Sequence, residues 1–282
     1  RLAHVGDRTG LEMIRTLQDH AIHRGATVLM EHTVISLILD GGRIAGVVAY
    51  DRERGRFHVI PAKTVVLACG GLGRAFSITS NSWEGTGDGH ALAYAAGAEL
   101  IDMEFVQFHP TGMVWPPSVK GILVTEGVRG EGGILLNCNG ERFMERYAPT
   151  LKDLAPRDFV SRCMDQEIKE GRGCGPHKDY IVLDMTHLGS DTIKKRLPSV
   201  LEIGHNFANV DITREPIPVV PTIHYQMGGV PTNVHGQVVA PKGGDPNAVV
   251  PIEVIGQRAA RFVSAAGPRP WRAGSRRRPA SA

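Results

Sequence analysis

The pattern of apolar and polar positions divides the first quarter of the chain into one helix and three strands. Residues 7–25 repeat apolar residues at helical spacing and end on a glycine, which predicts a helix. Residues 34–40 and 43–51 are rich in β-branched residues and flank a pair of glycines, a pattern typical of a hairpin. Residues 57–60 add a third apolar stretch after a polar turn. We therefore expect a helix followed by a β-meander.

A continuous apolar run then leads into paired glycines. Residues 64–73 read TVVLACGGLG, which predicts a strand buried on both faces. Such a strand can bring its backbone close to a phosphate or a ring at its carboxyl end, although an ordinary strand-to-loop turn has the same pattern. Residues 86–97 predict a turn and a small-residue helix. Asp88 lies at the start of that helix, where it would cap the helix or accept a hydrogen bond from a cofactor.

Between residues 116 and 221 the sequence pattern predicts short helices and loops. Residues 157–171 form an amphipathic pattern that predicts a helix. A second helix over 190–201 is expected to be interrupted near Pro198, and residues 215–221, EPIPVVP, to be extended. No run of 18 or more apolar residues occurs, so we expect no membrane span.

Composition adds a charge asymmetry to this picture. The chain has 282 residues, 42% of them hydrophobic and 22% charged, which is typical of a globular α/β protein. Its net charge is +3, but seven arginines and no acidic residue follow Glu253. Without those seven, 25 of the 32 basic residues remain against 29 acidic ones, so the body has a net charge of −4. The alternative to an aberrant tail is an acquired basic tail that binds nucleic acid or an acidic membrane surface. The scattered proline and glycine and the few aromatic residues favour an aberrant tail, and we expect no nucleic-acid partner.

The four cysteines lie far apart in the sequence. They form no Cys-x-x-Cys pair and have no histidine at metal-ligand spacing, so we expect buried thiols in a reduced, cytoplasmic protein and no metal site. They are Cys69, Cys138, Cys163 and Cys174.

The candidate chemistry is concentrated in residues 102–133. His109 lies between an aromatic residue and a proline, Thr125 precedes Glu126, and Arg129 follows three residues later. These groups can clamp carboxylates and exchange protons, which is what a site for a small dianion requires. The sequence therefore predicts a catalytic site here.

Seven motifs, in order along residues 7–251, resemble the flavoprotein subunits of succinate dehydrogenase and fumarate reductase. They are TVVLACGGLGR (64–74), TGDG (86–89), QFHPTG (107–112), LVTEGVRGEGG (123–133), GERFMERYAP (140–149), APRD (155–158) and HYQMGG (224–229). The resemblance implies an α/β fold: a partial FAD-binding domain of glutathione-reductase type with an inserted α+β capping domain.

The resemblance also implies domain boundaries. Residues 1–112 and 222–251 would belong to the FAD-binding domain and residues 113–221 to the capping domain. Residues 252–282 depart from the family, and we expect an aberrant, basic, disordered tail there. The Gly-x-Gly-x-x-Gly unit of the family is expected upstream of Arg1, so we expect the chain to be an internal fragment.

Substrate-binding roles follow from the same motifs. The resemblance implies that His109, Thr125 and His224 hold the carboxylates of succinate or fumarate.

Proton transfer is implied for Arg157, with Glu126 and Arg129 as its relay partners. An arginine is a poor base because its pKa lies above about 12, so a carboxylate relay is needed to exchange its proton.

The cofactor implied by the resemblance is FAD, contacted by Ala68, Gly70, Gly71 and Asp88. The implied partners are an iron-sulfur subunit that passes electrons to a quinone, and membrane-anchor subunits. We therefore expect a peripheral position at the cytoplasmic face of a bacterial inner membrane. Three alternatives remain: fumarate reductase, L-aspartate oxidase, and a catalytically inactive fragment.

Overall fold

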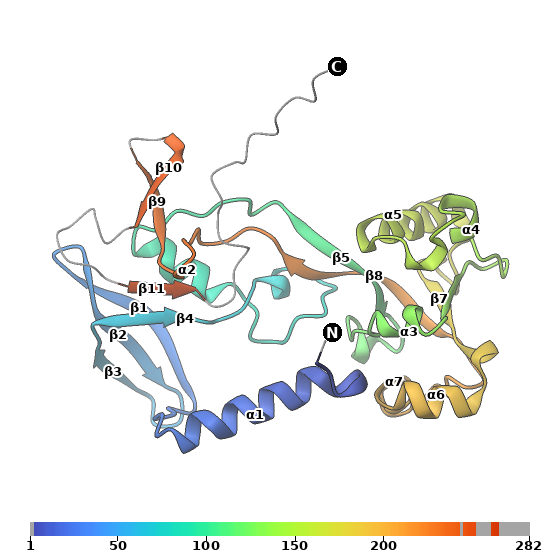
Figure 1. Cartoon of the computed structure of the whole chain (residues 1–282), viewed down its shortest axis with the longest axis horizontal. Coiled ribbons are helices and arrows are strands. Elements are labelled where there is room, and N and C mark those ends of the chain that lie inside the picture. Colours follow the sequence, from blue (N-terminus) through green and yellow to red (C-terminus); the bar gives the residue numbers. More distant parts are fainter. Residues whose placement is uncertain (1–2, 243–244, 252–260, 265–282) are drawn as a thin grey trace. The chain divides into compact units, whose positions relative to one another are not determined.

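The computed structural model describes residues 3–242, 245–251 and 261–264. The chain divides into two compact units, and each is described by itself (Figure 1). The first comprises Arg1–Val28, Phe76–Ser80 and Gln107–His224. The second comprises Leu29–Ala75, Asn81–Val106 and Tyr225–Ala282, as far as these residues are described. The predicted domain boundaries differ from this division and remain a prediction.

The second unit begins with the expected meander, drawn in blue in Figure 1. Strands β1 (His32–Asp40), β2 (Arg43–Asp51) and β3 (Arg56–Pro61) form an antiparallel sheet in the order β1-β2-β3. The hairpin prediction is confirmed, because the paired glycines lie at the β1–β2 turn.

Strand β4 (Thr64–Leu67) is shorter and more exposed than predicted. The rest of 64–73 is loop, and Val66 is 56% exposed, so the prediction of a strand buried on both faces is wrong. Within the described ranges β4 pairs only with β11 (Arg261–Ser264), in parallel, and no element covers Val66. The predicted tail 252–282 lies outside the described residues apart from β11.

Helix α2 (Asp88–Ala95) confirms the predicted small-residue helix and corrects its cap. Gly87 is the N-cap residue, with φ at +90°, and Asp88 is the first helical residue. Glycine suits this left-handed position because it has no Cβ. Strands β9 (Val239–Lys242) and β10 (Asp245–Pro251) form a separate antiparallel pair.

The first unit contains a four-stranded sheet with the order β5-β8-β7-β6. Its strands are β5 (Val106–Met113), β6 (Ile134–Leu136), β7 (Ile181–Asp184) and β8 (Ile217–Gln226). Strand β7 is antiparallel to both β6 and β8. Its helices are α1 (Thr9–His23), α3 (Gly127–Gly130), α4 (Met144–Tyr147), α5 (Arg157–Glu167), α6 (Ser190–Arg196) and α7 (Pro198–Ile203). One apolar core, which includes Leu135, Phe143 and Met164 without solvent exposure, joins the sheet to helices α3 to α7.

Three sequence predictions in this unit are confirmed. Helix α5 forms and continues as a π-helical turn over Ile168–Arg172. The second helix is interrupted where expected, since α6 ends at Arg196 and α7 restarts at Pro198. Residues 217–221 are extended within β8.

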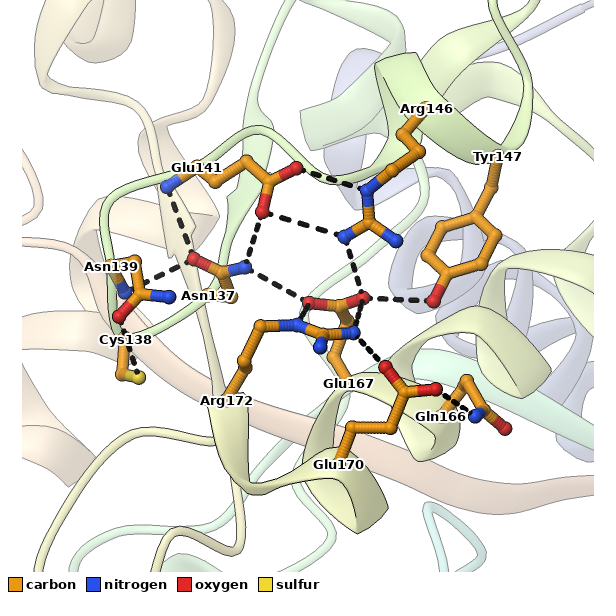
Figure 2. A network of polar contacts seen from close by, with 10 residues as sticks. All are labelled: Asn137, Cys138, Asn139, Glu141, Arg146, Tyr147, Gln166, Glu167, Glu170 and Arg172. Carbon is orange, nitrogen blue, oxygen red and sulfur yellow. Dashed lines mark hydrogen bonds and ion pairs between the residues drawn. The ribbon is translucent and has the colours of Figure 1, made fainter.

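A buried carboxylate fastens α5 to the rest of this unit (Figure 2). Glu167 has no solvent exposure and accepts hydrogen bonds from Asn137, Tyr147, Arg146 and Arg172. These residues come from α4, from the π-helical turn and from the segment after β6, so one carboxylate ties several elements to α5.

Helix α1 confirms the prediction for residues 7–25, but none of its described side chains is buried. Its apolar residues Leu11, Ile14 and Leu17 are 47%, 53% and 61% exposed. The expectation of buried thiols is wrong for part of the set: all four cysteines are free, but Cys69 and Cys138 are exposed. None of the helices in the described ranges is long and apolar enough to span a membrane.

Candidate active site

Neighbouring strands of the first unit bring two of the predicted histidines together. His109 lies on β5 and His224 on β8, and their ring centroids are 5.1 Å apart. His109 is 1% exposed, whereas His224 is half-buried. The strand order therefore joins residues that lie far apart in the sequence.

Both histidines are neutral donors or acceptors at physiological pH. Burial lowers the pKa of His109 to about 3, and electrostatic interactions with His224, Arg157 and Arg129 act in the same direction. Burial also lowers the pKa of His224, with Arg157 acting in the same direction and Glu126 opposing it.

The backbone fixes the tautomer of His109. The Thr111 N–H donates to Nδ1 of His109 at 3.3 Å, so Nε2 carries the ring proton. The Thr111 hydroxyl donates to the Val124 carbonyl at 2.7 Å, which holds β5 against the segment that precedes Glu126. His109 can thus donate a hydrogen bond to a ligand carboxylate.

A carboxylate lies between two guanidinium groups beside these histidines. Glu126 accepts a hydrogen bond from Arg157 Nε at 2.8 Å and a second from Arg157 Nη2 through the same oxygen. Its other oxygen lies 3.3 Å from Arg129 Nη2. Burial favours the protonated form of Glu126, but the hydrogen bond from Arg157 and the charges of Arg157 and Arg129 outweigh it and lower the pKa.

Arg129 is the buried end of this cluster. Its side chain is 1% exposed, and burial lowers its pKa while the charge of Glu126 raises it. One of its terminal nitrogens donates to the Asp153 carbonyl, but its Nε has no hydrogen-bond partner. A buried guanidinium with an unused donor is energetically costly, and a catalytic or ligand-binding role is one explanation for such a group.

Arg157 is the solvent-facing end of the same cluster, with its side chain 31% exposed. It is the first residue of α5, where a cation opposes the helix dipole. Gln107 Oε1 accepts a hydrogen bond from Arg157 Nη1 at 3.1 Å. Glu126 and Gln107 therefore hold the guanidinium in place although its position in the helix is unfavourable.

Thr125 directly precedes Glu126, and its hydroxyl accepts a weak hydrogen bond of 3.4 Å from the Gly127 N–H. Its hydroxyl donates to none of the described residues, so its hydrogen is available to a ligand.

Sequence reasoning missed three residues that orient this site. Gln107 and Thr111 lie inside the QFHPTG motif, so the motif contained a signal for them. Ser80, whose Oγ lies 2.7 Å from Nδ1 of His224, belongs to no motif and had no sequence signal.

The predicted cofactor residues lie in the second unit. Ala68, Gly70 and Gly71 form the loop after β4, and Gly70 has φ at +74°. A Cβ on Gly89, which follows Asp88 in α2, would lie 3.1 Å from Cys69 Cβ, so this loop packs closely against the start of α2.

This loop has the features of a cofactor cradle. The Oε1 of Gln226 is buried, accepts no hydrogen bond and lies 3.9 Å from the position of a Cβ on Gly71. An unused acceptor beside a glycine loop fits a cofactor with ring N–H groups, such as a flavin. The roles of Ala68, Gly70, Gly71 and Asp88 remain a prediction.

Comparison with known proteins places this architecture in the α/β FAD-binding class. The FAD binding domain model matches residues 1–248. The chain belongs to the FAD binding domain family.

The similar proteins have related names. The chain is 52% identical over 252 residues to the succinate dehydrogenase [ubiquinone] flavoprotein subunit of Oryza sativa, which covers 89% of the chain and 39% of the relative. It is 50% identical to the succinate dehydrogenase flavoprotein subunit of Rickettsia bellii, over 89% of the chain and 41% of the relative. The chain thus spans about two fifths of the length of these relatives.

Solved structures show the same similarity. A quinol fumarate reductase from E. coli that carries a point mutation superposes with a TM-score of 0.78 at 38% identity, over 83% of this chain and 42% of that one. Sdh1 of Mycobacterium smegmatis has a TM-score of 0.67 at 51% identity, over 85% and 42%. The predicted fold class and family resemblance are confirmed.

Proposed function

We propose that this chain is part of an FAD-dependent dehydrogenase subunit that oxidises succinate to fumarate. The observation that carries the proposal is the Glu126 carboxylate held between Arg157 and Arg129, close to the neutral His109 and His224. This arrangement offers donors for a dianion together with a path for one proton. The names of the relatives agree with this chemistry.

Three side chains hold the dicarboxylate in this proposal. His109 donates from Nε2 because Thr111 occupies its Nδ1, and Thr125 donates from its hydroxyl. His224, held by Ser80, contributes the third contact. Neutral donors suit this task because they bind carboxylates without drawing a proton from the relay.

Oxidation removes a hydride and a proton from adjacent carbons of succinate. FAD, when bound, supplies the two-electron acceptor for the hydride. Arg157 takes the proton, which requires that its own proton first moves to Glu126 along their hydrogen bond. Arg129, on the other oxygen of Glu126, keeps the transient charge balanced.

The partners are inferred from the relatives. An iron-sulfur subunit would receive the electrons and pass them to a quinone, since the names of relatives include ubiquinone and 8-methylmenaquinol. Membrane-anchor subunits would then hold the assembly at the cytoplasmic face of a bacterial inner membrane, with this chain peripheral.

Fumarate reduction is the second candidate. It is favoured by the TM-score of 0.78 to a quinol fumarate reductase and by 46% identity to the fumarate reductase flavoprotein subunit of Wolinella succinogenes. The same relay would run in reverse, with Arg157 donating the proton to fumarate.

The test is the visible absorption spectrum of the purified protein with and without added FAD, followed by titration with malonate. We expect a flavin band that shifts as malonate binds, and succinate-dependent reduction of an artificial acceptor. Absence of flavin binding would leave the chain a fragment without activity of its own. A flavin band that is insensitive to malonate but is bleached by L-aspartate would point to an oxidase.

A further inference from the structure

A second cluster of ligand-type side chains lies on the meander, outside the proposed active site. His32 opens β1, Asp51 ends β2 and His58 lies on β3. One ligand atom from each of them lies within 4.8 Å of the others. We propose that these three residues bind a divalent transition-metal ion of the Zn²⁺ type.

The strand register creates this cluster. His32 is the direct cross-strand partner of Asp51, and His58 pairs with Ala49, two residues before Asp51 on the same face of β2. Side chains of directly paired and diagonal positions on one face lie close together. The three ligands therefore come from three adjacent strands and need no loop to rearrange.

The donor set and spacing suit such an ion. Two imidazoles and one carboxylate form a common set for Zn²⁺ and related ions, with the fourth position left to water. Bonds of about 2.0–2.1 Å at tetrahedral angles place ligand atoms about 3.4 Å apart. His58 Nε2 and Asp51 Oδ2 are already 3.5 Å apart. The ligand atom of His32 lies within 4.8 Å of the other two, so metal binding requires a side-chain movement at this residue.

His58 has an unused nitrogen in the cluster. Its Nε2 is buried and makes no hydrogen bond, although Asp51 Oδ2 is near. A buried polar atom without a partner carries a desolvation cost that a bound metal would remove.

The other two ligands are oriented from outside the cluster. His32 Nδ1 donates to the Met30 carbonyl at 2.7 Å, which leaves the ring lone pair on Nε2. Metal-binding histidines are commonly held this way. Asp51 is fully buried, and its Oδ1 accepts the N–H groups of Glu53 and Arg54 at 3.1 Å each, so Oδ2 is left for the cluster.

Two arginines compete with a cation for Asp51. Arg54 Nη1 lies 3.4 Å and Arg56 Nε lies 3.7 Å from Oδ2 of Asp51. Their side chains are 55% and 60% exposed, so both can turn into solvent when an ion enters. If a metal ion binds Asp51, it must displace these arginines, so removing Arg54 should tighten metal binding. If the arginines only balance the charge of the buried carboxylate, removing Arg54 should have no such effect.

No local motif indicates this site, because its ligands belong to three different strands. The expectation of no metal rested on the cysteines alone. A bound ion would cross-link β1, β2 and β3 and stabilise the meander by mass action.

The test is calorimetric titration of the chelator-treated full chain with Zn²⁺ and Co²⁺, after alkylation of the exposed Cys69 and Cys138. We expect one bound ion per chain and a Co²⁺ spectrum without thiolate charge-transfer bands. His58→Gln should weaken binding at least tenfold and Arg54→Gln should tighten it severalfold, while His20→Gln, an exposed change on α1, should have no effect.

Two outcomes overturn the proposal. One is the absence of stoichiometric binding by the folded chain. The other is an affinity that is equal in the parent, His58→Gln and His20→Gln proteins, which would assign the ion to surface histidines. If His58→Gln fails to fold, an unchanged affinity of Arg54→Gln also rejects the site, because the Arg54 side chain is exposed and Arg56 remains near Asp51 when it is removed.

Discussion

Two clusters in the first unit place a glutamate between two arginines, but they differ in how completely their polar atoms are satisfied. In the structural cluster, Glu167 lies between Arg146 and Arg172 (Figure 2). In the candidate catalytic cluster, Glu126 lies between Arg157 and Arg129. The residue types are identical, so composition cannot explain a difference in role.

The two clusters differ in how fully the hydrogen-bonding groups of the glutamate and its arginines are used. Glu167 has no exposure, and Asn137 and Tyr147 add hydrogen bonds to those of its arginines. Burial acts to raise the pKa of Glu167, but the hydrogen bonds led by Arg172 lower it to about 2. The Glu126 side chain is 46% exposed. A saturated cluster fixes structure, whereas a cluster with unused donors can exchange a proton.

The sharpest way to test this contrast is Arg157→Lys. Lysine keeps the charge but loses the forked contact with Glu126 and Gln107, so we expect turnover to fall about 10⁴-fold, equivalent to about 5.5 kcal/mol of barrier. Steady-state succinate oxidation measures it, and malonate binding should persist. Arg162→Lys, an exposed change on the same helix, is the matched control. Unchanged turnover would remove Arg157 from the mechanism.

The structural cluster should respond in stability instead. Glu167→Gln leaves Arg146 and Arg172 without their buried counter-charge, and we expect a loss of about 3–5 kcal/mol in the free energy of unfolding. Denaturant titration measures this loss, while the malonate affinity of the remaining folded protein should be unchanged. A stable variant with poor malonate binding would reverse the assigned roles.

The pH dependence of the same variant provides an independent check. The pKa of Glu167 is about 2 in the folded chain and about 4.3 in an unfolded one, so its charge stabilises the fold above pH 4.3. That contribution is lost as the pH falls through about 2. The stability difference between parent and variant should therefore shrink on acidification, and a constant difference would contradict the assigned pKa.

Individual helices and strands could be predicted from the sequence more reliably than the packing of these elements against one another. The meander, α5 and the break at Pro198 follow from local periodicity and turn residues, and the structure contains all three. The prediction that residues 64–73 form a strand buried on both faces was wrong because an apolar run does not show whether other elements cover it. Val66, within this run, is exposed.

The candidate site shows the same limit. The motifs identified His109 and Glu126, but the contact of His109 with His224 depends on β5 lying next to β8. The burial of Arg129 depends on the packing around it. Ser80 and the His32 cluster lie in no motif, because only pairing across the fold brings their partners near.

A smaller effect is expected from His109→Ala, which changes binding rather than proton transfer. Loss of one hydrogen bond to a carboxylate should weaken malonate binding by about 1.5–3 kcal/mol, or roughly 10–100-fold. Because the pKa of His109 is about 3, its contribution should stay constant between pH 6 and 8. Titration of the flavin band with malonate across this pH range measures the affinity and its pH dependence. Loss of flavin from the variant would mean that His109 was misassigned.

The smallest effect should come from an exposed ion pair that has no further hydrogen bonds to described residues and lies outside the candidate catalytic cluster. Asp165 lies on α5 two residues before Glu167, and its carboxylate pairs with Lys169 at 2.6 Å, with the two side chains 54% and 69% exposed. Solvent screens this contact, so Asp165→Asn should change the free energy of unfolding by no more than about 0.5 kcal/mol. The same denaturant titration applies to both variants. A loss similar to that of Glu167→Gln would mean that any charge removed from α5 destabilises the helix, and that the saturation of Glu167 is not what makes it structural.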